Sequence, residues 1–195
     1  MADYTTLTTL KARLNITDTV DDAALTAAIT AASRVIDAAT GRYFYKQAAG
    51  TRYFTPDDWN TLILNEDLQA VTTFQTDITG ARTYDTSWSA TDYDLEPYSG
   101  PPYTRLCAAP RGYYTFPRIP KAVKIVGDWG YCATGSHPQE VEEATIIQAI
   151  RLFKRKDAPF GLLGTPELGV ARIPKVDTDV AALVAHLRRL DGLFA

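Results

Sequence analysis

The spacing of the apolar residues changes twice along this chain, and this constrains the fold more than any other feature. In residues 22–41 the apolar side chains recur at the spacing of one helix face. They are Leu25, Ala28, Ile29, Ala32 and Ile36. From Arg42 the spacing changes to the alternation of β-strands, and near Ser136 it changes back. The sequence therefore predicts an α+β fold, with a helical core formed by N- and C-terminal helices and an inserted, mainly antiparallel β region.

The predicted boundaries assign residues 1–41 and 136–195 to the helical core and residues 42–135 to the β-rich insertion. Residues 7–15 and 139–156 are expected to form further helices, and Gly41 is expected to end the helix that precedes it. The alanines of that helix leave a smooth surface, which packs either in its own core or, in part, against a neighbouring subunit.

Strand-length runs separated by turn signals fill the middle of the chain. They are TRYF, TLIL, AVTTFQTD, ARTYDT, DYDLEP, YTRLCA, GYYTFP and AVKIVGDWGY. In DYDLEP, Tyr93 and Leu95 alternate with three carboxylates, at Asp92, Asp94 and Glu96. Since no nucleophile or histidine is near them in the sequence, we expect these carboxylates to form a solvated strand face.

Composition and charge indicate a soluble globular protein. Hydrophobic residues make up 46% of the chain and charged residues 22%. With 20 basic and 23 acidic side chains the net charge is −3, which argues against a protein that grips phosphate backbones. No run of apolar residues is long enough to span a membrane, and the N-terminal residues lack the features of a signal peptide. We therefore expect no membrane partner and assembly in the cytoplasm.

Residues that could carry chemistry are few. The chain has none of the sequence motifs of nucleotide-binding sites, serine hydrolases or zinc proteases. Its only cysteines and histidines, at Cys107, Cys132, His137 and His186, match no known zinc-ligand spacing. We predict no catalytic, cofactor or metal site and no enzymatic activity. A Cys132–His137 nucleophile–base pair is a minor alternative, and the sequence leaves open whether the two cysteines pair.

A basic cluster ends the predicted helix 139–156, at Arg151, Lys154, Arg155 and Lys156. These residues contact a neighbouring subunit or another partner, or they are the solvated end of a helix whose dipole they complement.

A second feature is the GDWGY segment, which lies at the end of the predicted β region and precedes the C-terminal helices. Gly127 and Gly130 flank Trp129, which indicates a backbone conformation or a close approach that a side chain would forbid. We expect these three residues to form a structural junction, with Trp129 buried between the insertion and the helical core.

The order of several segments resembles the head–tail connector (adaptor, or head-completion) family of tailed bacteriophages. They are LTTLKARLNITDTVDDAALTAAITAASRVIDAATGRYF, DYDLEP, IPKAVKIVGDWGY, HPQEVEEATIIQAIRLFKRKDAPFGLLG and LGVARIPKVDTDVAALVAHLRRL, and together they cover nearly the whole chain. The resemblance implies a structural virion protein of the neck, between capsid and tail. It also implies a dodecameric ring between the portal protein and a stopper or tail-completion protein. Double-stranded DNA would pass through the lumen of that ring without sequence-specific binding.

The resemblance further implies that the C-terminal segment engages the portal. The last predicted helix, residues 177–190, carries an apolar stripe and is followed by a short apolar tail. Arg188, Arg189, Leu193 and Phe194 are therefore the candidate portal-contact residues. The alternative is that Phe194 folds back onto its own core.

A rival function is an aromatic-rich β binding module that recognises a carbohydrate or a protein on a surface. Most of the 11 tyrosines lie between Tyr43 and Tyr131, in the predicted β region, and exposed tyrosines are common at interfaces. Ring formation or portal binding distinguishes the connector from such a module.

Overall fold

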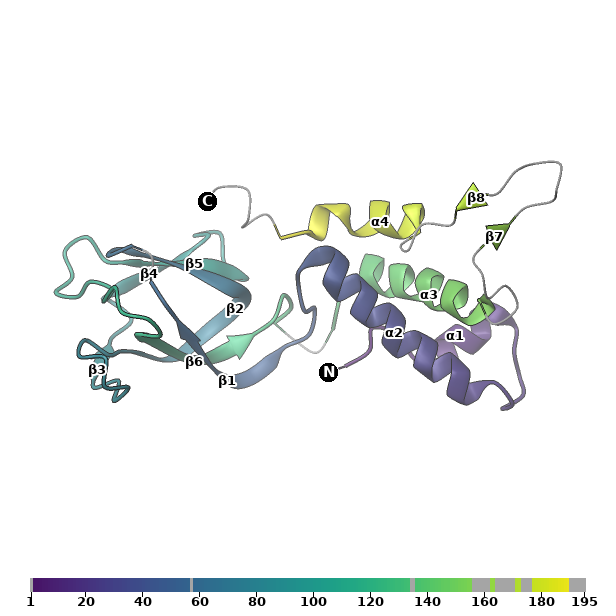
Figure 1. The fold of residues 1–195 in the computed structure, drawn as a ribbon, viewed down its shortest axis with the longest axis horizontal. Helices are drawn as coiled ribbons and strands as arrows, with labels where there is room; N and C mark the ends of the chain where they lie inside the picture. The colour runs from purple at the N-terminus through teal and green to yellow at the C-terminus, as the bar shows by residue number, and fades with distance from the viewer. Residues whose placement is uncertain are drawn as a thin grey trace. The chain divides into compact units, whose positions relative to one another are not determined.

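The helices from the two ends of the chain pack together in the computed structural model (Figure 1). The structure describes residues 2–56, 58–133, 136–155 and 177–189, and the backbone alone of residues 162–163 and 171–172. Two units are distinguished: a helical unit of Met1–Gly41 with His137–Ala195, and a β unit of Arg42–Ser136. All described helices lie in the first and the main sheet lies in the second, so the predicted α+β fold is confirmed.

The helical unit contains four α-helices and a 3-10 turn within the described residues. They are α1 (Leu7–Leu14), α2 (Asp22–Thr40), α3 (Gln139–Lys154), α4 (Thr178–Val184) and the turn Ala185–Leu187. The Thr6 side chain caps α1 by accepting a hydrogen bond from the Thr9 backbone N–H at 3.1 Å. As predicted, α2 ends at Gly41, which has a left-handed φ of 68°.

The core of the helical unit forms where α1, α2 and α3 meet. All five apolar residues of the stripe predicted for α2 are buried. The cluster that contains four of them consists of Leu10, Leu25, Ala28, Ile29, Ala32, Ile146 and Ala149. The alanines allow the helix backbones to approach closely, because they place little side chain between them.

The last helix is shorter than the predicted span of residues 177–190. Asp177 caps α4 by accepting a hydrogen bond from the Asp179 backbone N–H, and the α-helix ends at Val184. Beyond the 3-10 turn the backbone is extended at Arg188, and the Arg189 N–H donates to the Thr40 carbonyl oxygen at 2.8 Å. The Arg189 N–H thus bonds to the end of α2 and not to a carbonyl oxygen of the preceding turn.

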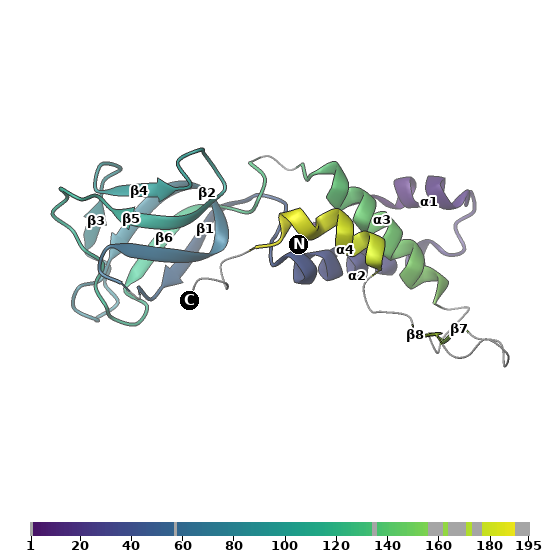
Figure 2. The ribbon, with the colours of Figure 1, turned by 90° about the horizontal axis from the view of Figure 1, so that it is seen from above.

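The β unit is built around a six-stranded antiparallel sheet (Figure 2). Its strands are β1 (Gln47–Phe54), β2 (Thr61–Thr76), β3 (Thr86–Trp88), β4 (Tyr93–Glu96), β5 (Tyr103–Ala108) and β6 (Val123–Trp129). The strand order is β1-β6-β2-β5-β4, and β3 pairs with β2. A separate two-stranded pair, β7 (Leu162–Leu163) and β8 (Ala171–Arg172), lies in the C-terminal part of the chain.

The two runs TLIL and AVTTFQTD form one strand rather than two. β2 is 16 residues long, and its pairing with β5 shifts register between Ile63 and Leu68. The irregularity falls on the polar run Asn65–Asp67, which the sequence pattern indicated to be a break between strands. Beyond this point the strand pairs mainly with β6.

Two other runs predicted as strands are irregular. Residues 112–117 contain no strand, and of residues 81–86 only Thr86 belongs to one. The Asp77 carboxylate accepts hydrogen bonds from the backbone N–H groups of Thr79, Gly80 and Arg82, which hold the chain in a loop after β2. Of their aromatic residues, Phe116 belongs to the core and Tyr114 packs against it, and both reach it from a loop.

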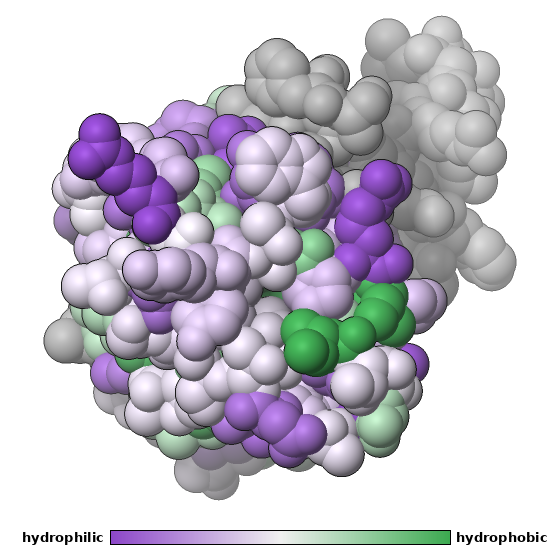
Figure 3. All heavy atoms as spheres, turned by 90° about the vertical axis from the view of Figure 1, so that its left-hand side faces the viewer, coloured by the Kyte–Doolittle hydropathy of each residue, from purple (hydrophilic) through white to green (hydrophobic). Residues whose placement is uncertain are grey.

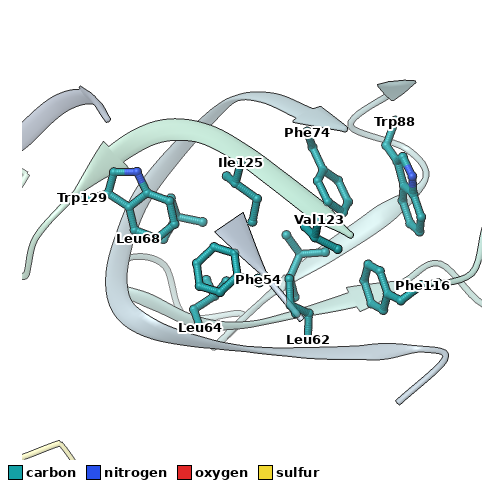
Figure 4. Packing of buried hydrophobic residues seen from close by; sticks show 11 residues of the cluster. Phe54, Leu62, Leu64, Leu68, Phe74, Trp88, Phe116, Val123, Ile125 and Trp129 are labelled. Carbon is teal, nitrogen blue, oxygen red and sulfur yellow. The ribbon is translucent and has the colours of Figure 1, made fainter. Parts of the chain in front are cut away.

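The core of the β unit is rich in aromatic residues (Figure 4). Its buried members are Phe54, Leu62, Leu64, Leu68, Phe74, Trp88, Leu106, Phe116, Val123, Ile125 and Trp129. The rings of Trp88 and Phe116 are stacked with centroids 5.1 Å apart, although Phe116 lies outside the strands. The Trp88 indole N–H donates to the Thr76 hydroxyl at 2.9 Å, so the polar group of this buried side chain is satisfied.

Candidate functional site

The segments that enter and leave the β unit are held side by side by β2. The Arg42 guanidinium lies 2.5 Å from the Asp67 carboxylate, whose side chain is 1% exposed. The Tyr131 backbone N–H donates to the Tyr43 carbonyl oxygen at 2.8 Å. The Gln69 side-chain amide donates to the carbonyl oxygens of Gly130 and Tyr131, at 2.9 and 2.6 Å. We call Arg42, Asp67, Gln69 and Tyr131 the clamp.

The clamp explains one of the two glycines of the predicted junction. Gly130 donates its N–H to the Asp67 carbonyl oxygen at 2.7 Å and has a φ of 122°. A Cβ atom at this position would lie 2.1 Å from the Tyr45 carbonyl oxygen. At Gly127 a Cβ would lie 2.3 Å from the Ala70 carbonyl oxygen, across the β6–β2 pairing. Both glycines are therefore required by close backbone approach, and Gly130 also by its φ.

Trp129 is buried, at 1% exposure. It is a member of the β-unit core, with its ring 5.8 Å from that of Phe54 and its indole N–H donating to the Gly50 carbonyl oxygen at 2.7 Å. The burial alternation of β6 continues through Trp129, so the β-unit core accounts for its burial. That Trp129 also faces the helical core stays a prediction.

The basic cluster at the end of α3 does not act as one group. Arg151 is largely buried and pairs with the Asp177 carboxylate at 3.3 Å, which links α3 to the start of α4. Lys154 and Arg155 are exposed, and Lys156 lies outside the described residues.

The candidate portal-contact residues are described only in part. Arg188 is exposed, and Arg189 is half-buried against the end of α2 through its backbone hydrogen bond to Thr40. Leu193 and Phe194 lie outside the described residues, as does Leu190.

The two cysteines are free thiols in poorly activating surroundings. Burial raises the pKa of Cys107, and the Glu96 carboxylate raises it further. Burial also raises the pKa of Cys132, with a further contribution from Asp67. A nucleophilic cysteine needs a lowered pKa, so these surroundings oppose the Cys132–His137 alternative.

The helical unit contains a buried polar network that the sequence analysis missed. The Tyr4 hydroxyl donates to the Asp37 carboxylate, which also lies 3.1 Å from the Arg34 guanidinium. Burial raises the pKa of Asp37, although the hydrogen bond from Tyr4 and the charge of Arg34 oppose the increase. The centres of the Tyr4 and His137 rings lie 5.4 Å apart, so Tyr4 contacts the segment that leads into α3. The network ties the N-terminal residues to α2 and has a structural role.

Surface features of the β unit are modest. An open hollow of about 460 Å³ is lined by Arg42, Glu96, Pro97, Pro102, Thr104, Arg105 and Tyr131. Its two arginines are paired with Asp67 and Glu96. On the face drawn in Figure 3, strongly hydrophilic residues are spread among near-neutral ones, and hydrophobic residues form only small areas.

Neither a metal centre nor a membrane span is found among the described residues. No group of three or more potential ligand side chains in this part of the chain is arranged to bind a metal ion. None of the described helices is both long and apolar enough to cross a membrane.

The described residues form an α+β protein with a helical unit and a β unit. The family described as phage gp6-like head-tail connector protein matches residues 4–82, which span the N-terminal helices and the first strands. This match confirms the resemblance to head–tail connectors that the sequence indicates. It favours a structural connector role over the carbohydrate- or protein-binding module. Among curated proteins, no sequence matches the chain significantly.

Solved structures of similar fold cover nearly the whole chain. The first is from the neck of an empty GTA particle computed with C6 symmetry, with a TM-score of 0.60 and 18% identity, covering 96% of this chain and 90% of that one. The second is from the neck of a native GTA particle computed with C12 symmetry, with a TM-score of 0.57 and 21% identity, covering 97% and 94%. A third, from the virion of a native gene transfer agent particle, has a TM-score of 0.52 and 19% identity and covers 96% and 90%. The fold of this chain is therefore similar to that of these proteins.

Proposed function

We propose that this protein is a structural connector of a virion neck, where it links the portal to the tail. The observation that carries the proposal is the fold likeness to neck proteins over 96–97% of the chain, together with the family match in its first part. The protein acts by binding other subunits, and no chemical step is part of its function.

The protein forms a ring of identical copies, most simply a dodecamer. The similar neck structures were computed with C6 and C12 symmetry, which supports a ring of this kind. On α2, Ala24, Ala27 and Ala31 are exposed and follow the spacing of one helix face. Small side chains let another backbone approach, so this face is one surface that a neighbouring subunit could cover.

The partners above and below the ring are the portal protein and a stopper or tail-completion protein. Arg188, Arg189, Leu193 and Phe194 combine positive charge with large apolar side chains, the types that dominate protein–protein contacts. The cluster around Lys154 and Arg155 offers a second exposed surface to a subunit or partner. Double-stranded DNA passes through the lumen without sequence-specific binding, since the net charge of −3 disfavours a tight hold on phosphates.

Electron microscopy of the purified chain, alone and mixed with portal assemblies, tests the proposal. We expect rings with an axial channel, or a ring of added density on one face of the portal. A glycan-binding assay of the same preparation tests the rival binding module. Monomeric particles that leave the portal undecorated but bind a glycan would contradict the connector function.

A further inference from the structure

Aromatic rings and cations form one surface on and beside β1, an edge strand of the main sheet. The Lys121 ammonium lies 4.5 Å from the centre of the Tyr53 ring, and the Lys124 ammonium lies 5.8 Å from that of Tyr84. The two rings are 5.5 Å apart, and Tyr53 is 44% exposed. Arg82 reaches the same place, because its guanidinium donates to the Pro120 carbonyl oxygen. We call Tyr53, Arg82, Tyr84, Lys121 and Lys124 the basic face.

The positive charge of the basic face is not neutralised by the described residues around it. Arg42, Arg52 and Arg105 of the β unit each have a carboxylate within ion-pair distance. None of the ion pairs between described residues involves a cation of the basic face.

Two acidic residues lie in the loop beside these cations, but the carboxylate of each accepts hydrogen bonds from groups of the same loop. The Asp77 carboxylate accepts hydrogen bonds from the Thr79, Gly80 and Arg82 backbone N–H groups. The Asp85 carboxylate accepts one from the Thr83 hydroxyl. The cations therefore remain available to a carboxylate from outside the unit.

The basic face is held in place by the backbone. The Lys121 N–H donates to the Thr55 hydroxyl oxygen at 2.8 Å, and the Tyr84 hydroxyl donates to the Lys121 carbonyl oxygen at 2.9 Å. Lysines on an unconstrained solvated loop would lose entropy on binding. A surface that is already ordered loses less, which favours a binding role.

The other edge strand of the sheet, β4, carries negatively charged side chains. Tyr93 and Leu95 pack toward the core, so the alternation places Asp94 and Glu96 on the outer side. Glu96 pairs with Arg105 at 3.3 Å, whereas Asp94 is exposed and has no ion pair among the described residues. We call Asp94 and Glu96 the acidic edge.

The strand order places the two surfaces at the two ends of the sheet. β1 and β4 are its edge strands, and neither pairs with a further strand on its outer side within the described residues. Copies related by rotation in a ring meet through two different, complementary surfaces. From this complementarity we infer that the basic face of one copy contacts the acidic edge of the next. The inference rests on the proposed ring and assigns it a subunit contact.

Nucleic acid is the other ligand that a basic, aromatic face can suit. The second copy is favoured because the matching acidic surface exists on the same chain, and because the chain as a whole carries a net charge of −3. Binding to a DNA duplex, measured beside self-association, distinguishes the two ligands.

Charge reversal of one exposed residue on each surface tests the contact. Lys121→Glu and Asp94→Lys are each expected to weaken self-association about tenfold, because like charges then face each other. An equimolar mixture of the two variants should recover the association that each variant alone has lost. The new carboxylate of the first variant then faces the new ammonium of the second, and the alternate contact joins the unchanged Lys121 and Asp94. Sedimentation velocity at low ionic strength measures association, and melting temperatures show that each variant is folded.

The matched control is Arg111→Glu, which makes the same charge change at an exposed arginine elsewhere in the β unit. It should associate like the wild type. Lys121→Glu and Asp94→Lys variants that associate like the wild type overturn the contact but leave the connector function untouched. Wild-type protein that stays monomeric up to about 1 mM also overturns it, and portal binding by that monomer would still support a connector. Loss of binding to a DNA duplex in Lys121→Glu, with association unchanged, would assign the basic face to nucleic acid instead.

Discussion

Arg42 and Asp67 form an ion pair with 2.5 Å between guanidinium and carboxylate, where the chain enters the β unit. The Arg42 guanidinium also lies 5.0 Å from the centre of the Tyr131 ring, where the chain leaves it. The buried Asp67 carboxylate on β2 therefore orders both the segment by which the chain enters the β unit and the segment by which it leaves. Because a buried charge depends on its partner, we expect this pair to matter for stability.

Replacing Arg42 by Ala should destabilise the protein by about 3–5 kcal/mol, because it leaves the buried Asp67 carboxylate without its cation. Denaturant unfolding of the variant measures the change. Arg105→Ala is the control, since its partner Glu96 and its own side chain are more exposed, and it should cost less than about 1 kcal/mol. Equal effects of the two substitutions would contradict a special role for the clamp.

Trp129→Ala should destabilise the protein by about 3–5 kcal/mol, because it removes a large side chain from the β-unit core and leaves the Gly50 carbonyl oxygen without its donor. Thermal unfolding provides the measurement. Trp59, which is 60% exposed, supplies the control, and Trp59→Ala should change stability by about 0.5 kcal/mol or less. A Trp129→Ala protein that melts within a degree or two of wild type would show that the side chain is not needed.

Gly130→Ala and Gly100→Ala separate two costs of replacing a glycine. Both residues have positive φ values, 122° and 113°, but only at Gly130 would the added Cβ meet backbone, 2.1 Å from the Tyr45 carbonyl oxygen. At Gly100 nothing lies within 4 Å of the added atom. Gly100→Ala should therefore cost about 1–3 kcal/mol of backbone strain, and Gly130→Ala clearly more. Equal melting temperatures for the two variants would exclude the steric contribution.

Asp77 should make stability depend on pH in the acidic range. Burial tends to raise the pKa of its carboxylate, but hydrogen bonds from the backbone N–H groups of Arg82, Thr79 and Gly80 outweigh burial and hold the pKa below its usual 3.8. Since the pKa is lower in the folded state, the stabilisation is present above pH 3.8 and is lost as the pH falls through the folded-state value. Asp77→Asn should thus melt below wild type at about pH 7, and the difference should shrink toward about pH 3. A constant difference over this range would contradict the assignment.

Truncation after Leu190 tests the C-terminal tail. If Leu193 and Phe194 contact the portal, the shortened chain should keep its melting temperature and bind portal assemblies at least about tenfold more weakly. A Leu193→Ala, Phe194→Ala chain of full length controls for the loss of the backbone. Wild-type affinity in the truncated chain would exclude the tail as the anchor, and a lowered melting temperature would indicate that Phe194 packs on its own core.

The sequence alone determined α1, α2 and α3, because a helix depends mainly on residues close together in the chain. The end of α4 at Val184 is the exception. The stripe from Leu25 to Ile36 and the stop at Gly41 are local signals, and both are confirmed. The same holds for the glycines of GDWGY, whose need for a special backbone position was visible from their spacing around Trp129.

The tertiary structure alone decided where side chains of the β unit meet, because strand pairing joins residues that are far apart in the chain. The polar run Asn65–Asp67 reads as the end of a strand, yet β2 continues through it and turns Asp67 toward Arg42. Lys121 and Tyr53 carry no signal in the sequence and form a surface only once β1 pairs with β6. Periodicity reports which face of an element is buried, whereas the partner on that face depends on register and loop geometry, which only the folded chain specifies.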